Sequence, residues 1–315
     1  SGCQLVSHGR ILQYLDNRSK TITMFLEEIS NEVDVIIFYI FCGISGVAFI
    51  LFLLSMFVIG CGCKRWGFMV AIDQGIFIGG LLLCATVLMK GLKIEWLDGL
   101  DRFRDLCQVY PAGLTLGLTY IIGGLLVKAI AILDQFKSAK SSRSPFRGWK
   151  PALGIFVLVV IDAVVIIVWS LVFRNTAVAE VVNGESKFRC ISNPDHPMAK
   201  DAFEWAILAF HAFLLLLAAI MVWPALYKVY SGPAATETKF VTFMVYNIFL
   251  ACVVPGMVIH FLLWNQRRIS VSIYYGVIGG LTLYAVISTM LLVIASQAMV
   301  GGARKRRRDR QYDED

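Results

Sequence analysis

The chain has 315 residues, of which 58% are hydrophobic and only 16% are charged, and its mean hydropathy is +0.71. Soluble domains are about 45–50% apolar and about a quarter charged, so this composition excludes an ordinary soluble protein and also a disordered one. The formal net charge of +7 does not indicate a nucleic-acid partner, because the basic residues flank apolar segments and are expected at membrane edges. We therefore expect an all-α protein that crosses a membrane several times.

Seven apolar blocks are long enough to cross a bilayer as helices, which takes about 20 residues each. The expected spans are Val35–Ile59, Phe68–Met89, Val109–Asp134, Ala152–Phe173, Ala202–Tyr227, Phe240–Trp264 and Ser270–Met299. The connections are short and polar, and the longest, Arg174–Asp201, contains the turn-forming pair Asn183-Gly184 and has room for a hairpin. The prediction is a seven-transmembrane helix bundle over residues 35–299.

The distribution of charges predicts an extracellular N-terminus and a cytoplasmic C-terminus. In this orientation the inner segments hold slightly more Lys and Arg than the outer segments. The sequon Asn17-Arg18-Ser19 then lies outside, where Asn17 is a glycosylation acceptor. We expect residues 1–34 to form an extracellular stalk and residues 300–315 to form a cytoplasmic tail, basic at first and then acidic.

Two cysteines lie in or beside the expected outer loops, in an oxidising compartment. Cys107 precedes the third span, and Cys190 lies in the loop that follows the fourth. A disulfide between them would hold that loop over the bundle; two unrelated thiols are the alternative. The other cysteines and the four histidines are scattered, so we expect neither a metal site nor a cofactor.

Charged residues inside the spans are few, and each costs about 2.5–3.5 kcal/mol at the bilayer centre, so each needs a reason. Asp162 lies in the middle of the fourth span. Lys128 is 19 residues after Val109, or about 28 Å along a helix, which brings it close to the cytoplasmic face. Glu237 precedes the sixth span at that same face. An ion pair between Lys128 and Glu237 is one interpretation, and a lysine that reaches lipid phosphates is the other. Asp73 is expected to be solvated.

Small residues recur at a spacing of four in three of the spans, which permits close contact between helices. The pairs are Gly75 and Gly79, Gly113 and Gly117, and Gly276 and Gly280. This pattern indicates a packed bundle without specifying which helices meet.

The sequence contains none of the protease, hydrolase or nucleotide-binding motifs, so we expect no enzyme activity. A transporter would show broken helices and repeated halves, and seven spans divide poorly into halves. A channel would show a filter sequence or a polar-lined span. The residues therefore favour a receptor, with a transporter or channel as the second possibility.

A succession of short motifs then suggests a family. These motifs are Cys107-Gln108, Leu116-Gly117-Leu118, Tyr120, Gly123 and Lys128 in the third span, Trp149-Lys150, Asp162 and Trp169 around the fourth, His211 to Leu217 in the fifth, and Thr238-Lys239-Phe240 and Val245-Tyr246-Asn247 in the sixth. In their order and spacing they resemble the transmembrane domain of class C G-protein-coupled receptors of the GABA-B type. The resemblance covers about residues 35–295.

The resemblance implies roles for several residues. It implies a resting-state salt bridge between helices 3 and 6, formed by Lys128 and Glu237, and a disulfide between Cys107 and Cys190. Polar packing inside the membrane is expected from Asp162, Trp169, Tyr246 and Asn247.

The resemblance also implies a function. Such receptors reside in the plasma membrane, work as dimers among the membrane lipids, and signal to heterotrimeric G proteins through inner loops, here 136–150 and 227–239. Their transmitter binds a large bilobed outer domain, and residues 1–34 are too short to form one. Family members end helix 7 with Pro-Lys, whereas this chain has Ala295 to Met299 there, so a receptor subunit that does not signal stays open as an alternative. The expected function is a transmembrane signalling domain.

Overall fold

The structure is a computed structural model that describes residues 35–57, 68–91, 100–138, 150–172, 176–182, 185–191, 197–228, 233–259 and 271–314. In chain order its elements are the helix Val35–Phe57, α2 (Phe68–Gly91), α3 (Leu100–Leu118), η2 (Thr119–Gly123), α4 (Gly124–Ser138), α5 (Lys150–Val172), β1 (Thr176–Val182), β2 (Glu185–Ile191), α6 (Pro197–Lys228), α7 (Pro233–Ile248), η3 (Phe249–Val253), α8 (Val254–Val258) and α9 (Val271–Glu314). Seven membrane-length apolar helices are present in the described residues, at the places that the sequence predicts.

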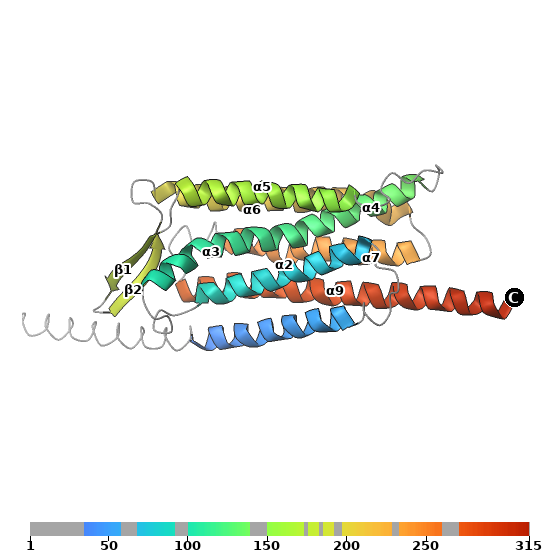
Figure 1. The fold of residues 1–315 in the computed structure, drawn as a ribbon, viewed down its shortest axis with the longest axis horizontal. Coiled ribbons are helices and arrows are strands. Elements are labelled where there is room, and N and C mark those ends of the chain that lie inside the picture. Colours follow the sequence, from blue (N-terminus) through green and yellow to red (C-terminus); the bar gives the residue numbers. More distant parts are fainter. Residues whose placement is uncertain are drawn as a thin grey trace, which may run out of the picture.

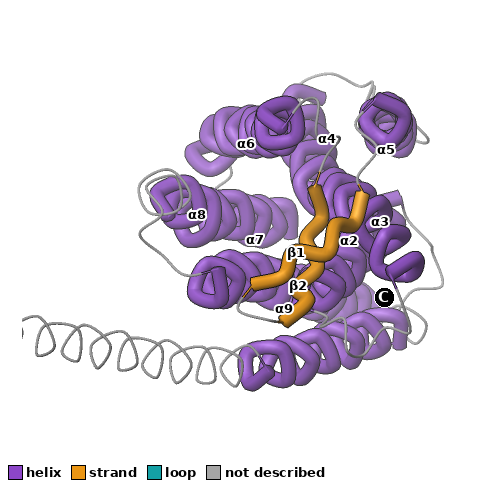
Figure 2. The backbone as a smooth tube through the Cα atoms, turned by 90° about the vertical axis from the view of Figure 1, so that its left-hand side faces the viewer, coloured by secondary structure: helices purple, strands orange, loops and turns teal. Residues whose placement is uncertain are grey.

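The helices lie side by side along one long axis, as Figure 1 shows. The β1–β2 hairpin lies at one end of the bundle, and the C-terminal part of α9 extends beyond the other end. Viewed along the axis from the hairpin end, the helix Val35–Phe57 and α5 stand on the outside of the bundle (Figure 2). The predicted seven-helix bundle is therefore confirmed.

The third and sixth spans are single rods that each contain a short π-helical segment. α3, η2 and α4 form one rod, and α7, η3 and α8 form the other. In the second rod Pro255 has no N–H to donate to the carbonyl four residues earlier, and the backbone N–H of Val254 bonds instead to the carbonyl of Phe249, five residues back. A wide turn of this kind aims the side chains on either side of it in new directions, and such turns are frequent at functional sites.

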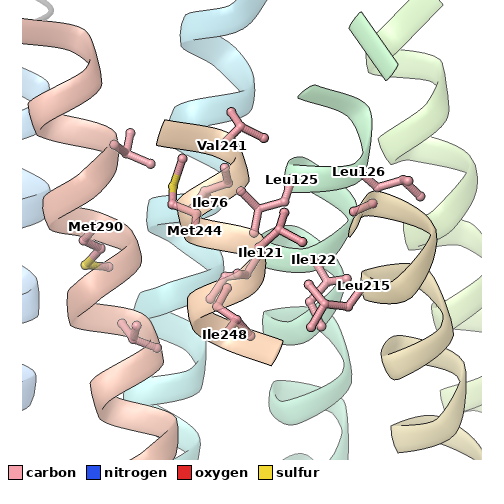
Figure 3. Packing of buried hydrophobic residues seen from close by; sticks show 14 of the residues in the cluster. Ile76, Ile121, Ile122, Leu125, Leu126, Leu215, Val241, Met244, Ile248 and Met290 are labelled. Atoms are coloured by element: carbon pink, nitrogen blue, oxygen red, sulfur yellow. The ribbon is translucent and has the colours of Figure 1, made fainter. Parts of the chain in front are cut away.

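The third span is the centre of the bundle. In its membrane window 72% of the residues are buried, against 17% for the first span and 11% for the fourth. Apolar side chains from α2, α6, α7 and α9, including Ile76, Leu215, Met244 and Met290, pack around those of the third span, which include Leu125 (Figure 3). Their interdigitation supplies the van der Waals contacts that hold helices together where lipid tails are as apolar as the side chains themselves.

Two of the predicted glycine pairs face each other across α2 and α3. A Cβ atom on Gly79 would lie 2.8 Å from the carbonyl oxygen of Gly117, and a Cβ on Gly117 would lie 2.7 Å from a methyl group of Leu83. A Cβ on Gly113 would lie 2.6 Å from the hydroxyl of Thr86. These contacts have no space for a methyl group, so the glycines allow the two backbones to approach closely.

The loop after the fourth span forms the hairpin that its length permitted. β1 and β2 are antiparallel, with Thr176 opposite Ile191 and Val182 opposite Glu185. β1 lies against α3, so the hairpin is next to the beginning of the third span.

Several helices extend beyond their predicted ends; α3 begins at Leu100 and α6 at Pro197, and α7 and α9 are also longer than expected. α7 begins at Pro233, because proline fits the first helical turn and the alanines after it favour helix, so Glu237 lies within the helix. α9 continues to Glu314, through most of the predicted tail 300–315, whose Arg, Lys and Gln residues are good helix formers.

Candidate functional site

A buried ion pair lies near the end of the bundle that is far from the hairpin. Lys128 on α4 is only 1% exposed, and its Nζ forms a salt bridge with Oδ1 of Asp73 on α2. The side chains of the two residues are 2% and 7% exposed. An isolated charge at this depth is costly, and the pairing offsets much of that cost.

A third helix joins this pair. The side-chain amide of Gln297 on α9 donates a hydrogen bond of 3.0 Å to Oδ2 of Asp73. Asp73 and Gln297 are close to the ends of their spans, three residues after Val70 and two residues before Met299. We call Asp73, Lys128 and Gln297 the inner cluster; it ties α2, α4 and α9 together at one membrane edge.

The inner cluster corrects two predictions. Lys128 was expected to pair with Glu237, and Asp73 was expected to be solvated. Among the described side chains no ion pair joins Lys128 to Glu237, which is half-buried on α7, and Asp73 is 5% exposed. The physical reason is the contact between α2 and the third span, which places Asp73 directly against α4.

The sequence did contain a signal for Asp73. Phe77, Gly80, Cys84 and Val87 follow it at intervals of three to four residues, and all four are buried in the structure. Asp73 therefore continues the stripe of α2 that faces the core. Its position near the end of an apolar block hid this periodicity. Nothing local to Gln297 indicated its contact with a helix more than 200 residues earlier in the chain.

At the hairpin end of the bundle, Cys107 is buried and disulfide-bonded. Cys190 lies in β2 opposite Ala177 of β1, the strand that lies against α3. The side chain of Cys190 is outside the described residues, so its pairing with Cys107 stays a prediction. Among the cysteines whose side chains the structure describes, Cys42, Cys84 and Cys252 are free thiols.

Asp162 and Trp169 are both buried on α5, at 2% and 3% exposed. Oδ2 of Asp162 lies 3.8 Å from Nε2 of His211 on α6. The same nitrogen is 2.9 Å from the hydroxyl oxygen of Thr119, the first residue of η2. The fold thus brings Asp162 next to His211, which in turn contacts Thr119; the sequence analysis gave neither of these two residues a role.

Asn247 connects α7 to α9. Its side-chain amide donates a hydrogen bond of 2.9 Å to the hydroxyl of Ser288, and its oxygen accepts one of 3.0 Å from the hydroxyl of Tyr284. The ring of the neighbouring Tyr246 meets the ring of Trp223 on α6 edge to face, with centroids 6.3 Å apart. Both residues of this pair from the sixth span therefore make contacts between helices.

The remaining predicted sites are only partly described. Asn17 lies outside the described residues, as do residues 139–149 and 229–232 of the two inner loops.

The comparison with known families agrees with the bundle. The family described as "7 transmembrane sweet-taste receptor of 3 GCPR" matches residues 32–297, which is most of the chain and includes the first six spans and nearly all of the seventh.

Curated relatives include the gamma-aminobutyric acid type B receptor subunit 2 of Rattus norvegicus, Mus musculus and Homo sapiens. Each is 25% identical over 205 residues, a segment that covers 63% of this chain and 21% of the relative. The chain thus matches about a fifth of the length of these relatives. From the family match, the chain belongs to the class C G-protein-coupled receptors and is a multi-pass plasma-membrane protein with their seven-helix receptor domain.

Proposed function

We propose that this chain is the transmembrane signalling domain of a GABA-B-like class C receptor. It has its N-terminus outside the cell and relays activation from an extracellular ligand-binding domain to a heterotrimeric G protein. The family match and the likeness to gamma-aminobutyric acid type B receptor subunit 2 support this proposal. That likeness extends over about a fifth of the length of each relative. The ligand, the G protein and the dimer partner are therefore parts of this proposal.

The inner cluster is the observation that carries the proposal. A relay needs an element with two arrangements whose equilibrium an outside event can bias. Asp73 and Lys128 either touch, with their charges compensated in the apolar core, or separate, in which case each needs water or another partner. Their separation would release α2 and α9 from the third span at one membrane edge, which is where we place the G protein.

We therefore assign the resting latch to Lys128 and Asp73, with Gln297 as a supporting contact. In this proposal an activating movement draws α2 and α4 apart at the inner face. Glu237 lies on α7 and has no part in the closed arrangement.

At the outer end we propose that the disulfide of Cys107 closes on Cys190, so that the hairpin is fixed to the third span. Since the third span also carries Lys128, one rod would connect the extracellular loop to the latch. The G protein would contact the inner loops 136–150 and 227–239, the receptor would act as a homodimer or heterodimer, and Asn17 would carry the glycan.

The test is nucleotide exchange on purified heterotrimeric G proteins by the full chain in lipid nanodiscs. Asp73→Asn removes the latch charge and keeps the side-chain shape, and Glu237→Gln is the matched control on α7. If the latch contributes about 1 kcal/mol to the resting state, Asp73→Asn raises basal exchange about five-fold and the control leaves it unchanged.

Other outcomes would contradict the proposal. If Glu237→Gln raised basal exchange more than Asp73→Asn does, the latch would instead involve Glu237 on α7. If exchange stays at the background rate for every variant and every G protein but appears with a second receptor chain, this chain is a subunit that does not signal. Solute flux into liposomes would instead indicate a transporter.

A further inference from the structure

α5 is attached to the bundle by very few buried side chains. Between Leu153 and Leu171 only Asp162 and Trp169 are buried. One of the two is therefore a carboxylic acid, in a stretch whose other side chains are apolar or small apart from Ser170. An acidic group in the middle of a spanning helix is a functional-site candidate, and its partner has to be identified.

That partner is the imidazole of His211, one nitrogen of which already forms a hydrogen bond. Nδ1 of His211 lies 2.8 Å from the backbone carbonyl oxygen of Ile207. A carbonyl oxygen only accepts hydrogen bonds, so Nδ1 carries a hydrogen. The charge on His211 therefore depends on whether Nε2, which faces Thr119 and Asp162, is also protonated.

The surroundings of Nε2 do not satisfy an ionised Asp162 beside a neutral His211. A neutral Nε2 accepts the hydrogen of the Thr119 hydroxyl, and it then has none to donate to Asp162. Oδ2 of Asp162 is buried and has no hydrogen-bond partner among the described residues. In this arrangement a full negative charge would lie uncompensated inside the membrane, which is strongly unfavourable.

Other titratable groups on the third span and on α2 are engaged elsewhere. Lys128 pairs with Asp73 and is nine residues, or about 14 Å, along the rod from Thr119. The ring of Tyr120 lies against α2 at Gly75 and Gly79, and Tyr110 is the same distance from Thr119 in the opposite direction. Among the described side chains of α2 and α3, the remaining titratable ones are those of Cys84 and of disulfide-bonded Cys107.

α7 and η3, which pack against α6, supply no ion pair to Asp162 either. Glu237 and Lys239 lie in the first turns of α7, Tyr246 contacts Trp223, and Cys252 lies in η3. Among the described side chains His211 is the only basic group within 4.0 Å of the Asp162 carboxylate.

We propose that Asp162 and His211 form a buried binding site for one proton, taken up from water, which keeps the pair neutral while α5 is docked on the third and fifth spans. The proton occupies either Oδ2 of Asp162 or Nε2 of His211. In the first case a carboxylic acid faces a neutral imidazole, and in the second a carboxylate faces an imidazolium. Both have the same net charge, so the proton belongs to the pair and not to either residue alone.

The experiment counts this proton in the full chain in lipid nanodiscs. Infrared spectra in H2O and D2O detect a protonated carboxyl group, and ¹⁵N NMR of labelled histidine distinguishes imidazole from imidazolium. Asp162→Asn and His211→Gln identify the signals of the two residues by their loss. At neutral pH the two signals together should account for one proton.

The single variants sharpen the test, because a group that loses its partner should be neutral. In Asp162→Asn, His211 should be uncharged; in His211→Gln, Asp162 should be a protonated acid. Thr119→Val keeps the pair and should leave the count at one, and Asp73→Asn, at the other buried carboxylate, should change neither signal.

Two results would overturn the proposal: a carboxylate beside a neutral imidazole in the unmodified chain, or a lone charged group in either single variant. Because Asp162→Asn alters one of the two buried residues that attach α5 to the bundle, its thermal unfolding transition is recorded first. If this variant does not fold, the unmodified chain and Thr119→Val still give the proton count.

Discussion

Asp73 on α2 and Lys128 on α4 form an ion pair that is almost wholly enclosed by protein, and the side-chain amide of Gln297 on α9 completes it. Burial makes the intact pair and a pair with one charge removed very different in energy. Together the two charges offset each other, but removal of one leaves the other unpaired in a medium of low dielectric constant. The pair is therefore suited to hold a closed state and to make its opening costly.

The first prediction concerns this pair. Asp73→Asn should lower the free energy of unfolding by about 3 kcal/mol, because Lys128 loses its counter-charge. Glu237→Gln should change it by less than about 0.5 kcal/mol. Denaturant titration of both variants in the same detergent measures the difference. The double exchange Asp73→Lys with Lys128→Asp should recover part of the loss, and failure to recover any would mean that packing matters more than charge.

The second prediction concerns the contact between α2 and α3. Gly79→Ala would place a methyl group 2.8 Å from the carbonyl oxygen of Gly117, so the helices must separate, at a cost of about 1–3 kcal/mol. Gly280 is the matched control, because a Cβ there meets nothing within 4 Å. Gly280→Ala should be neutral or slightly stabilising, since alanine favours helix. Equal losses in the thermal stability of both variants would refute the close contact.

The third prediction concerns the disulfide of Cys107. Cys107→Ser and Cys190→Ser should each lower stability by about 2–4 kcal/mol, and the double variant should lose no more than either single variant. Cys252→Ser, at a free thiol, is the control. Peptide mass spectrometry without reductant identifies the partner of Cys107 directly. A bridge that persists in Cys190→Ser would assign the partner to another cysteine.

The bundle was predictable because its signal is local. Each span is a continuous apolar block, and lipid requires each block to satisfy its own backbone as a helix. Lys128 and Asp162 were also identified, since a charge in an apolar block is visible without knowledge of its neighbours.

Partner choice was not predictable in the same way. Two acids, Asp73 and Glu237, lie near the same membrane edge as Lys128. The choice between them depends on which helix packs against α4. The contact of Thr119 with His211 joins residues 92 positions apart. Thr119 also lies in a π-helical segment that no local sequence pattern indicated. Glycine spacing indicated close packing, but only the fold shows that α2 meets α3.

The last prediction concerns the polar connection between α7 and α9. Asn247 accepts a hydrogen bond from Tyr284 and donates one to Ser288, whose hydroxyl donates to the carbonyl of Ala285. Hydrogen bonds between membrane helices contribute about 0.6 kcal/mol on average, so Tyr284→Phe should lose about that amount.

Asn247→Leu breaks both contacts and should lose about twice as much, while Ser288 keeps its bond to its own helix. Tyr246→Phe is the control, because it keeps the ring that contacts Trp223. A double-mutant cycle of Asn247→Leu with Tyr284→Phe should give a coupling energy near the cost of Tyr284→Phe alone, since the second change removes a hydroxyl that has already lost its acceptor. Additive losses would mean that the hydroxyl of Tyr284 stabilises the bundle through some other contact, and the connection between the two helices would then rest on Ser288.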